Sequence, residues 1–475
     1  MKRAVVIGAG IAGLAAALSL REHAKGAPFE IVILDKNPKP GGNIVTERAD
    51  GFLIEGGPDC FLSEKPWAME LCKRLGLEHE LLMTNDEFRK TFVYSRGALH
   101  ELPEGVILMI PTKILPLAFS SLITFKGKFR MFMELFVPKK KDGEDESLAS
   151  FVRRRLGQEA LDKIAEPLVA GVHAGDPDTM SVRSSFPKFV QMEEEYGSLI
   201  KGMLKRLSLI KKGAAPLGER PEKVTMFVTL KHGLGVLVAE ITKRLSGFEN
   251  TFIKTGAGVE YVSAKRGSFE VVLKGNGSIE ADAVIIAAPA YAASHLVKRL
   301  DPGISEKLLS IPYASTATIS LGFNKKDIAH PMNGFGFVVP KIEKRRIMAA
   351  TWVSRKFKYR APEDNVLIRC FAGGAKDPAI VRLSDEELVK IARHELKEIM
   401  GIVSEPVLAR VYKWINAMPQ YTIGHEQRVS EIEALLGAHH GLYLTGSAYR
   451  GIGISDSIRN AEIAAKKALH HLSAA

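Results

Sequence analysis

The sequence is poor in cysteine. Only three cysteines occur among 475 residues, Cys60, Cys72 and Cys370, and no two of them form a C-x-x-C pair. Disulfide frameworks and zinc sites both need cysteines that are paired or clustered along the chain. We therefore expect neither a disulfide-stabilised fold nor a bound metal, and the cysteine content suits a reducing compartment such as the cytoplasm.

Long uninterrupted hydrophobic runs are also missing. The N-terminus lacks the layout of a secretory signal, because its first apolar run leads directly into a glycine turn. The most apolar stretch, residues 105–137, is interrupted by Pro111, Lys113 and Pro116. A membrane-spanning helix needs roughly 20 apolar residues in a row. We expect short helices here, which would either lie on a membrane surface with a basic rim or pack as an ordinary helical subdomain.

Several catalytic and binding motifs are absent. The chain has no G-x-S-x-G, no H-E-x-x-H and no closely spaced pair that must be a nucleophile and its base. No segment resembles a nucleic-acid-binding module, although the formal net charge is +12. The excess of Lys and Arg therefore favours an acidic substrate or an anionic membrane over a nucleic acid.

What the sequence does contain is a strand, a glycine turn and a helix at its start. Ala4–Ile7 is a short apolar run typical of a buried strand, and Leu14–Leu20 is an alanine-rich segment typical of a helix. Between them, Gly8, Gly10 and Gly13 have G-x-G-x-x-G spacing. These glycines allow a sharp turn, the approach of a pyrophosphate to the backbone, and close packing of the helix on the strand. The helix N-terminus would face the phosphates.

A second apolar strand, Ile31–Leu34, ends in an acidic residue, Asp35. An acid at this position can bind a ribose 2′-hydroxyl and disfavours a cofactor that carries a 2′-phosphate. Strand, turn, helix and acid in this order predict a dinucleotide site. The residues expected to form it are Gly8, Gly10, Ile11, Ala12, Gly13, Asp35 and Lys36.

Three further glycine-rich turns indicate a long cofactor. Gly41-Gly42 and Gly56-Gly57-Pro58 place small residues where a ligand can pass close to the backbone, and "GSAYRGIGIS" precedes a helix expected over Ser455–Ala468. The N-terminus of that helix would stabilise negative charge on a reduced flavin ring. An extended FAD would place its adenosine at the first turn and its ring near the last. The residues expected at the ring end are Gly446, Gly451, Ile452, Gly453, Ile454 and Ser455.

Motifs spread over almost the whole chain carry a resemblance to a known family. Besides the first glycine turn and Gly41-Gly42, they are "IEGGPD", "EPLVAGVHAGDP", "GFGFVVP", "VYKWINAMPQY" and "GSAYRGIGISDSI", in that order. Together they resemble the oxygen-dependent protoporphyrinogen oxidases, above all the bacterial branch that includes coproporphyrinogen III oxidases. The resemblance implies an FAD enzyme of haem synthesis that oxidises a porphyrinogen to its porphyrin in three two-electron steps, each of which gives hydrogen peroxide.

The resemblance also implies individual site residues. Val259 would lie beside the adenine and Trp414 near the flavin. A loop at residues 171–174 would lie under the macrocycle and offer backbone carbonyls to the pyrrole N–H groups. The residues implied for substrate binding are Gly171, Val172, His173, Ala174, Val338, Trp352 and Phe371. His173 is a candidate base, although a histidine in such a loop is more often structural; the flavin carries the chemistry, and no catalytic side chain is predicted.

The sequence departs from the family at a carboxylate-binding position. Animal and plant members have an arginine for a substrate propionate, whereas the matching residue here is Thr91, with Arg89, Lys90 and Arg96 nearby. The choice between a dicarboxylate, protoporphyrinogen IX, and a tetracarboxylate, coproporphyrinogen III, therefore stays open. Because there is no second nucleotide fingerprint for NAD(P)H, we expect dioxygen to reoxidise the flavin.

The predicted fold is a mixed α/β structure in which the domains interleave along the chain. A Rossmann-like FAD-binding domain would comprise residues 1–75, 222–295 and 405–475, and a mixed-sheet substrate domain residues 76–104 and 296–404. Residues 105–221 would form a helical insertion. We expect a cytoplasmic protein, and both a homodimer and peripheral contact with the cytoplasmic membrane face stay open.

Two other functions remain as alternatives. A flavin amine oxidase or carotenoid desaturase would share the glycine turns at the two ends of the chain, but the aromatic residues near those turns, Trp414 and Tyr449, make only a thin amine-binding cage. A protein that binds FAD at a membrane surface without catalysis would also fit. Oxygen consumption in the presence of a porphyrinogen distinguishes the enzyme from this last alternative.

Overall fold

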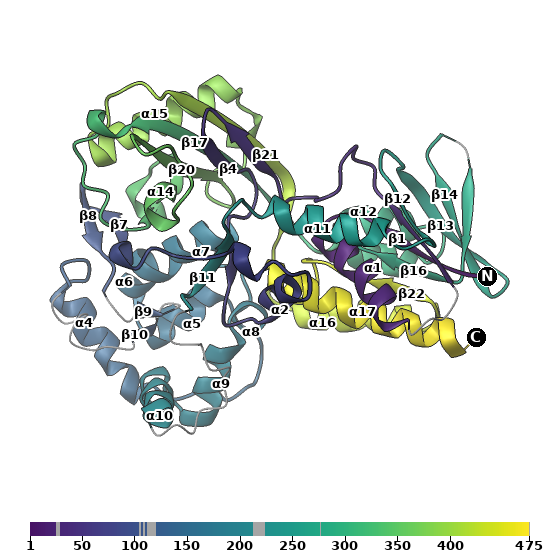
Figure 1. The fold of residues 1–475 in the computed structure, drawn as a ribbon. Helices are drawn as coiled ribbons and strands as arrows, with labels where there is room; N and C mark the ends of the chain where they lie inside the picture. The colour runs from purple at the N-terminus through teal and green to yellow at the C-terminus, as the bar shows by residue number, and fades with distance from the viewer. Residues whose placement is uncertain are drawn as a thin grey trace.

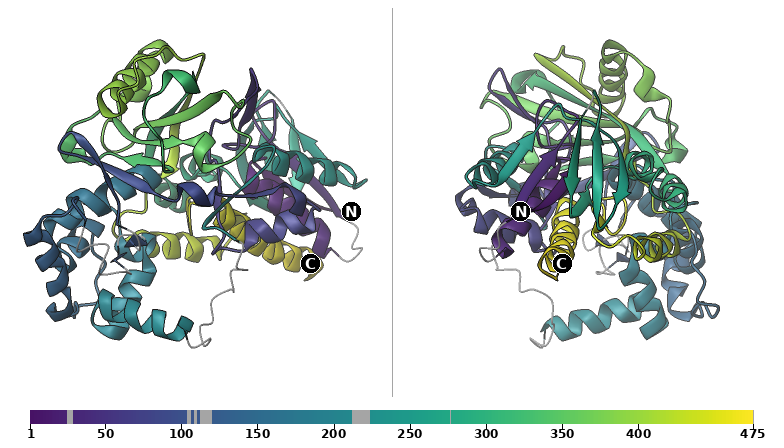
Figure 2. Two further views of the ribbon diagram at one scale, coloured as in Figure 1. Left: turned by 60° about the vertical axis from the view of Figure 1, so that its left-hand side comes forward. Right: turned by 90° about the vertical axis from the view of Figure 1, so that its right-hand side faces the viewer.

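A computed structural model of the chain describes residues 1–24, 29–103, 106–107, 110–111, 120–211, 224–275 and 277–474. It is a mixed α/β structure, as predicted, with a parallel sheet in one lobe and a larger mixed sheet above a helical region in the other (Figure 1). Both chain termini lie at the outer end of the first lobe (Figures 1 and 2).

The first lobe is built on a five-stranded parallel sheet that is buried on both faces. Its strand order is β12 (Thr251–Lys254), β2 (Phe29–Leu34), β1 (Lys2–Ile7), β16 (Ala283–Ile286) and β22 (Leu442–Leu444). These strands read as continuous Val, Ile, Leu and Ala runs because neither face meets water. The strands at the two ends of the chain, β1 and β22, both flank β16.

Side chains alternate between the two faces of this sheet, and each face has its own helical cover. On one face, α1 (Ile11–His23) and α17 (Ile454–Ala474) pack side by side, together with α11 (Gly235–Ser246) and α2 (Trp67–Arg74). The other face packs against α12 (Ala290–Val297), α13 (Pro302–Leu309) and α16 (His425–Leu436). A three-stranded antiparallel sheet covers the rest of that face; its strands are β13 (Val259–Lys265), β14 (Ser268–Leu273) and β15 (Ser278–Ala281).

The second lobe contains a seven-stranded mixed sheet. Its strand order is β21 (Leu408–Pro419), β17 (Tyr313–Asn324), β20 (Asn365–Gly373), β19 (Ile347–Trp352), β18 (Gly336–Val338), β7 (Thr91–Ser95) and β8 (Ala98–Glu101). The hairpin of β7 and β8 turns at Arg96-Gly97, where both residues have positive φ, as a tight two-residue turn requires. One face of the sheet packs on α15 (Asp385–Met400), which begins with a capping box at Ser384.

Some elements lie outside their predicted domains. Helix α13 falls in the segment 296–404 that the sequence assigned to the substrate domain, but it packs on the parallel sheet of the first lobe. Strand β21 falls in the segment 405–475 that the sequence assigned to the FAD-binding domain, but it pairs along its length with β17 of the seven-stranded sheet. The chain therefore crosses from one lobe to the other after Pro419, and β21 carries residues of the substrate lobe toward the cofactor lobe.

Helices fill the lower part of the second lobe. They are α4 (Phe125–Phe132), α5 (Leu148–Arg155), α7 (Glu166–His173), α8 (Val182–Ser185), α9 (Pro187–Tyr196) and α10 (Leu199–Lys211), around their own apolar core. At the centre, fully buried Arg155 pairs with fully buried Glu134. Among the residues described here, no helix combines the length and apolarity that a membrane crossing needs.

The segment 105–137, predicted as short helices, is only partly described. Residues 104–105, 108–109 and 112–119 lie outside the described part of the chain. Where the chain is described, β9 (Val106–Ile107) and β10 (Ile110–Pro111) form an antiparallel pair, so the prediction of helix is wrong for these four residues. Helix α4 and a 3-10 turn over Met133–Phe136 follow, as short helical elements.

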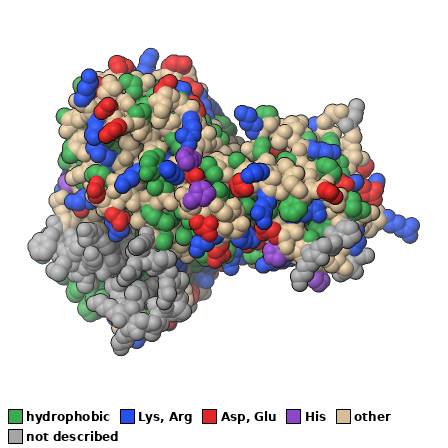
Figure 3. All heavy atoms as spheres, in the orientation of Figure 1, with side chains coloured by type: hydrophobic (Ala, Val, Ile, Leu, Met, Phe, Trp, Pro, Cys, Tyr) green, Lys and Arg blue, Asp and Glu red, His purple; other side chains and the backbone are tan. Residues whose placement is uncertain are grey.

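On the face of the molecule in Figure 3, acidic and basic side chains are interspersed.

Candidate cofactor and substrate site

A single large cavity runs between the two lobes. Its volume is about 2460 Å³. Its walls run from the first glycine turn and the glycine-rich segment before α17, both in the first lobe, to β18, β19 and β20 of the second lobe. Sites for one small ligand usually measure about 300–1,000 Å³. The cavity is therefore large enough to hold a dinucleotide and a second sizeable molecule together.

At one end of the cavity the first glycine turn packs too closely for any side chain. Gly8 has φ +108°, and a Cβ built on it would lie 2.7 Å from the carbonyl oxygen of Ala287. A Cβ on Gly13 would lie 1.8 Å from the carbonyl oxygen of Gly8. Gly10 is different, since a Cβ there would meet only the Cα of Gly42, at 3.8 Å. Gly8 and Gly13 are therefore needed for packing, whereas Gly10 keeps the cavity wall open.

Helix α1 begins at this turn with no side chain capping it. Its N-cap residue is Gly10, and its first turn has no acidic residue. The first N–H groups of a helix have no partner within the helix, and the helix dipole adds partial positive charge there. Because Gly10 and Ile11 line the cavity, this N-terminus is available to a phosphate group.

Asp35 lies at the end of β2, as predicted, and holds the glycine turn in place. Its carboxylate accepts hydrogen bonds from the backbone N–H groups of Ala9, at 2.6 Å, and Asn37, at 2.7 Å. Asp35 and Lys36 also line the cavity, as does Val259 from β13. The ribose contact of Asp35 and the adenine contact of Val259 remain predictions.

The other glycine turns converge on the same cavity. The N–H of Gly41 donates to the carbonyl of Ala9 at 2.8 Å, so the second diglycine lies against the first turn. A Cβ on Gly57 would lie 1.8 Å from the carbonyl oxygen of Asn43. Gly41, Gly42, Gly57 and Pro58 line the cavity, while Gly56 and Gly13 lie behind its wall.

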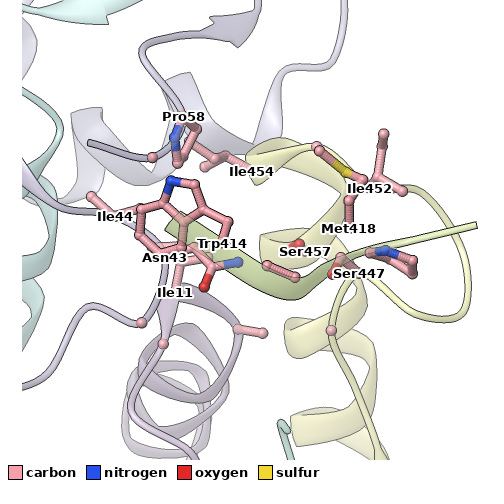
Figure 4. A pocket seen from close by; sticks show the side chains of 18 of the residues that line it. Ile11, Asn43, Ile44, Pro58, Trp414, Met418, Ser447, Ile452, Ile454 and Ser457 are labelled. Carbon is pink, nitrogen blue, oxygen red and sulfur yellow. The ribbon is translucent and has the colours of Figure 1, made fainter. Parts of the chain in front are cut away.

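The far end of the chain completes this part of the cavity. Gly446 and Gly451 have positive φ, and α17 starts at Ile454, with the cavity at its N-terminus. Figure 4 shows Ile452 and Ile454 from this segment facing the same space as Ile11, Pro58 and Trp414. All the residues predicted for the ring end line the cavity; they are Gly446, Gly451, Ile452, Gly453, Ile454 and Ser455.

The geometry of this half fits a flavin dinucleotide. Both helix N-termini and three turns without side chains border one elongated space, which is what a pyrophosphate with groups at both ends requires. The hydroxyl of Tyr449, buried in the wall, has no hydrogen-bond partner among the described residues. A buried polar group without a partner is costly, and a polar ligand would satisfy it.

The opposite end of the cavity is formed by side chains on the seven-stranded sheet. Val338 of β18, Met348 of β19 and Phe371 of β20 line it. Ala349 pairs with Phe371 across the two strands, and Arg369 pairs with Thr351, so these residues share one face. This face presents apolar side chains to the cavity beside Arg369 and Thr351; that Val338 and Phe371 bind the substrate remains a prediction.

Trp352 does not lie on that face, which corrects its prediction. It pairs with Ile368, one residue out of phase with Thr351 and Arg369, so its side chain points to the opposite face of the sheet. There it is fully buried in the core under α15 and contacts the rings of Phe92 and His330. The neighbouring residue of β19 that lines the cavity is Thr351.

Residues 171–174 were predicted as a loop, but they form the last turn of α7 and its C-cap. The helix ends at His173, and Ala174 has the left-handed conformation of a C-cap, with φ +51°. Gly171, Val172, His173 and Ala174 all line the cavity. The carbonyl of His173 accepts a hydrogen bond from the Gln420 amide at 3.1 Å, and that of Ala174 accepts from the N–H of Ala375 at 3.0 Å. That carbonyls of this turn bind pyrrole N–H groups remains a prediction.

His173 lies deep in the cavity wall while part of its surface stays open to the cavity. Its ring packs edge-on against Phe186, with centroids 5.6 Å apart. Burial lowers the pKa of His173 to about 4, and the nearby Lys65 ammonium adds to the effect. The imidazole is therefore neutral at pH 7. The structure places it at the site without assigning it a role as a base.

Two buried basic residues in the wall were missed. Lys356 and Arg369 both line the cavity and are 8% and 4% exposed. Arg369 donates to the carbonyls of Gly56 and Gly57, and the same Gly56 carbonyl accepts from the Trp414 indole and the Thr318 hydroxyl, both at 2.9 Å. Strand alternation could have identified Arg369, since it lies two residues before Phe371 on one strand.

The fold and the cavity together define a dinucleotide-dependent redox protein with a separate substrate lobe. Sequence comparison gives the class: residues 11–469 match the family described as flavin containing amine oxidoreductase. The chain belongs to this family, and its cofactor is FAD.

Two bacterial relatives match the chain over nearly its full length. Coproporphyrinogen III oxidase of Bacillus subtilis is 38% identical over 99% of this chain and 98% of its own. Coproporphyrinogen III oxidase of Staphylococcus aureus is 31% identical over 99% of this chain and 100% of its own. A chloroplast protoporphyrinogen oxidase of Nicotiana tabacum is 27% identical over 96% of this chain and 83% of its own.

Solved structures place the fold in the same group. A candidate protoporphyrinogen oxidase from Exiguobacterium sp. 255-15 superposes with a TM-score of 0.86 at 30% identity, over 99% of both chains. A putrescine oxidase superposes with a TM-score of 0.67 at 16% identity, over 99% of both chains, which shows a shared fold.

Proposed function

We propose that this protein oxidises a porphyrinogen to its porphyrin in haem synthesis, with FAD as cofactor and dioxygen as the final acceptor. The observation that carries the proposal is the single cavity that has a dinucleotide cradle at one end and an apolar slot at the other. In the overall balance the macrocycle loses six hydrogens, as three hydrides and three protons. Three dioxygen molecules take them up and become three molecules of hydrogen peroxide.

When bound, FAD supplies the two-electron acceptor for each oxidation, so the protein needs to bind and orient the substrate. Val338, Met348 and Phe371 offer an apolar wall to the macrocycle. In the last turn of α7, the carbonyls of His173 and Ala174 already accept from Gln420 and Ala375, so those of Gly171 and Val172 are the proposed acceptors for pyrrole N–H groups. Together these groups would fix the reacting carbon relative to the ring end of the cradle.

Cations at the cavity wall suit a substrate with carboxylates. Lys65 and Lys188 line the cavity, and each has one acidic neighbour, Asp456 at 2.6 Å and Glu64 at 3.4 Å. Thr91, which stands where some relatives have arginine, also lines it. Carboxylates favour such charged donors, so these two lysines are the proposed anchors for propionate groups.

The test compares three substrates at equal concentration. Purified protein is supplied with coproporphyrinogen III, protoporphyrinogen IX or putrescine, and both oxygen uptake and porphyrin fluorescence are recorded. We expect three oxygen molecules consumed per porphyrin formed, and no uptake with putrescine. Autoxidation is subtracted with protein that has been stripped of FAD. If oxygen were consumed with putrescine but with neither porphyrinogen, the protein would be an amine oxidase and the proposal would be wrong.

A second proposal is peripheral contact with a membrane. Helix α4 and the 3-10 turn after it expose a row of large apolar side chains: Phe125 is 86%, Phe129 is 60% and Phe136 is 70% exposed. Lys126 and Lys128 lie on the same helix. An amphipathic surface of this kind, apolar with basic neighbours, suits an anionic bilayer.

Vesicle cosedimentation tests the contact. Phosphatidylcholine vesicles with and without phosphatidylglycerol are mixed with the wild type and with Phe125→Ser/Phe129→Ser/Phe136→Ser. We expect the wild type to bind anionic vesicles, more weakly at high salt, and the triple variant to stay in solution. Ile342→Ser, at an exposed apolar residue elsewhere, is the control. Equal sedimentation of wild type and triple variant would exclude this surface.

A further inference from the structure

A group of buried charges lies directly behind the Gly56–Cys60 turn. The ammonium of Lys356 is 3.2 Å from the Asp59 carboxylate and 3.4 Å from the Cys60 sulfur. The same ammonium lies over the rings of Phe227 and Phe357, at 4.8 and 5.0 Å from their centroids. Asp59, Cys60 and Lys356 all line the cavity.

Positive charge exceeds negative charge in this group. Lys356, Arg360 and Arg369 are buried cations. Their acidic neighbours are Asp59 and Glu55. Burial opposes ionisation of Asp59, but Lys356 and Arg369 outweigh it and lower the Asp59 pKa, so this carboxylate is charged. Burial raises the pKa of Glu55 to about 7, which leaves it about half protonated near neutral pH.

Cys60 does not supply the missing negative charge. Burial, followed by the Asp59 charge, raises the pKa of its thiol to about 12, so it is neutral. Lys356 stays protonated: burial opposes its charge, but the Asp59 carboxylate 3.2 Å away outweighs burial and raises the pKa of Lys356. A buried cation without full compensation is costly, and it favours a negative charge in the adjoining space.

Arg369 links this excess charge to the ring end of the cavity. Its guanidinium donates to the carbonyls of Gly56 and Gly57, and Trp414 donates to the same Gly56 carbonyl. Its Nε is buried and has no hydrogen-bond partner among the described residues. The turn that it holds is the one that packs against Asn43 and Trp414, next to the first glycine turns.

We propose that Lys356 and Arg369, only partly balanced by Asp59, stabilise the negative charge that the bound flavin acquires on reduction and so raise its reduction potential. Charge close to the ring is one of the means by which a protein tunes a flavin. The inference rests on the FAD assignment and not on the identity of the substrate. Lys356 and Arg369 act here as positioning and charge-tuning residues rather than catalytic ones.

The test measures the flavin reduction potential in the absence of substrate, by equilibration with a reference dye. The variants are Lys356→Met, Asp59→Asn and the double variant. Lys356→Met removes a positive charge at nearly constant shape, and Asp59→Asn removes the balancing negative charge. The control pair is Lys307→Met and Glu431→Gln, which break a half-exposed ion pair at 2.6 Å between α13 and α16; neither residue lines the cavity.

We expect the two single variants to shift the potential in opposite directions. Lys356→Met should lower the ratio of reduced to oxidised flavin at a fixed potential about tenfold, which is about 30 mV for a two-electron couple. Asp59→Asn should raise that ratio by a similar factor, and the double variant should return close to the wild type. The control pair should leave it unchanged, because an exposed pair is screened.

Three outcomes would overturn the proposal. If both single variants shift the potential in the same direction, the cluster acts through structure rather than charge. If all potentials stay within error while Lys356→Met raises KM for porphyrinogen, the cations bind a substrate carboxylate instead. If FAD content falls without any change in the potential of the flavin that remains bound, the cluster serves only to hold the turn. The first and third outcomes do not depend on whether porphyrinogen is the substrate, so failure of the charge-tuning proposal can be told apart from failure of the proposed function.

Discussion

The dinucleotide end of the cavity presents backbone to its ligand, whereas the substrate end presents side chains. At the first end, glycines at Gly8, Gly10 and Gly57 keep side chains out, and helix N-termini and turns form the walls. At the second end, Val338 of β18 and Phe371 of β20 share one face because each pairs with Ala349 of β19, the strand between them. A backbone site depends on local spacing, and a side-chain site depends on which face each strand turns inward.

The largest expected effect breaks the dinucleotide end by packing alone. Gly13→Ala places a Cβ 1.8 Å from the Gly8 carbonyl oxygen, both in rigid backbone, so α1 must move away from β1. We expect a loss of more than about 4 kcal/mol in the free energy of unfolding, measured by denaturant titration. Unchanged stability would mean that the turn relaxes.

Gly10→Ala is the matched comparison, since it adds the same methyl group one turn of chain away. The only atom near its Cβ is the Cα of Gly42, at 3.8 Å, so the fold has room for it. Stability without FAD should therefore stay close to the wild type, while FAD affinity falls because the methyl group enters the phosphate space. A folded variant with full FAD content would contradict a pyrophosphate at Gly10.

The difference between a site made of backbone and a site made of side chains explains which features could be predicted from the sequence. The glycine turns, the acid at the end of β2, the hairpin at Arg96-Gly97 and the strands of both sheets follow from local patterns of apolar, glycine and turn residues. The face of β19 does not, because a shift of one residue inverts every side chain and the strand is apolar on both sides. The resemblance placed Trp352 in the cavity, the strand pattern offered nothing to correct it, and Thr351 was missed.

Buried charge was the other feature that sequence could not supply. Lys356 follows a strand in the segment "WVSRKFKYR", where a basic residue suggests a solvated loop. Its burial results from two distant segments that close over it, at Asp59 and Phe227, together with the neighbouring ring of Phe357. Arg369 could have been identified from the sequence, because a charged residue in the middle of an apolar strand is unusual.

The next largest effect tests the corrected face of β19. Trp352→Ala empties a fully buried position in the core under α15. We expect a loss of about 3–5 kcal/mol in the free energy of unfolding, with normal FAD content and little change in kcat/KM for the folded protein. If stability were kept and kcat/KM fell, Trp352 would belong to the substrate slot after all.

Phe371→Ala is the counterpart of Trp352→Ala on the cavity face of the sheet, and it should lower turnover rather than stability. The ring lines the cavity beside Arg369, whose guanidinium lies 4.9 Å from its centroid. Losing an apolar and aromatic contact with the macrocycle should lower kcat/KM for porphyrinogen roughly tenfold, about 1.4 kcal/mol, while FAD content stays normal. A destabilised variant with unchanged kcat/KM would assign Phe371 to the core instead.

The smallest expected effect concerns the histidine at the end of α7. The pKa of His173 is about 4 in the folded protein, because burial and Lys65 disfavour its charged form, and about 6.5 in the unfolded chain. Between these values the unfolded chain binds more protons at this residue than the folded protein does. Stability is therefore lost as the pH falls from 6.5 toward 4, and none of this loss is present above pH 7.

His173→Phe removes that titration and keeps a ring against Phe186. We expect the wild type to lose about 1 kcal/mol more than the variant between pH 7.5 and pH 5.5, measured as free energies of unfolding in denaturant. His425 is also buried, with its pKa lowered to about 4, and it is unchanged in both proteins, so the difference between them isolates His173. Parallel pH profiles would show that the folded protein accommodates a charged His173. The half-buried ring of His173 would then keep enough contact with the cavity to carry its charge in the folded protein.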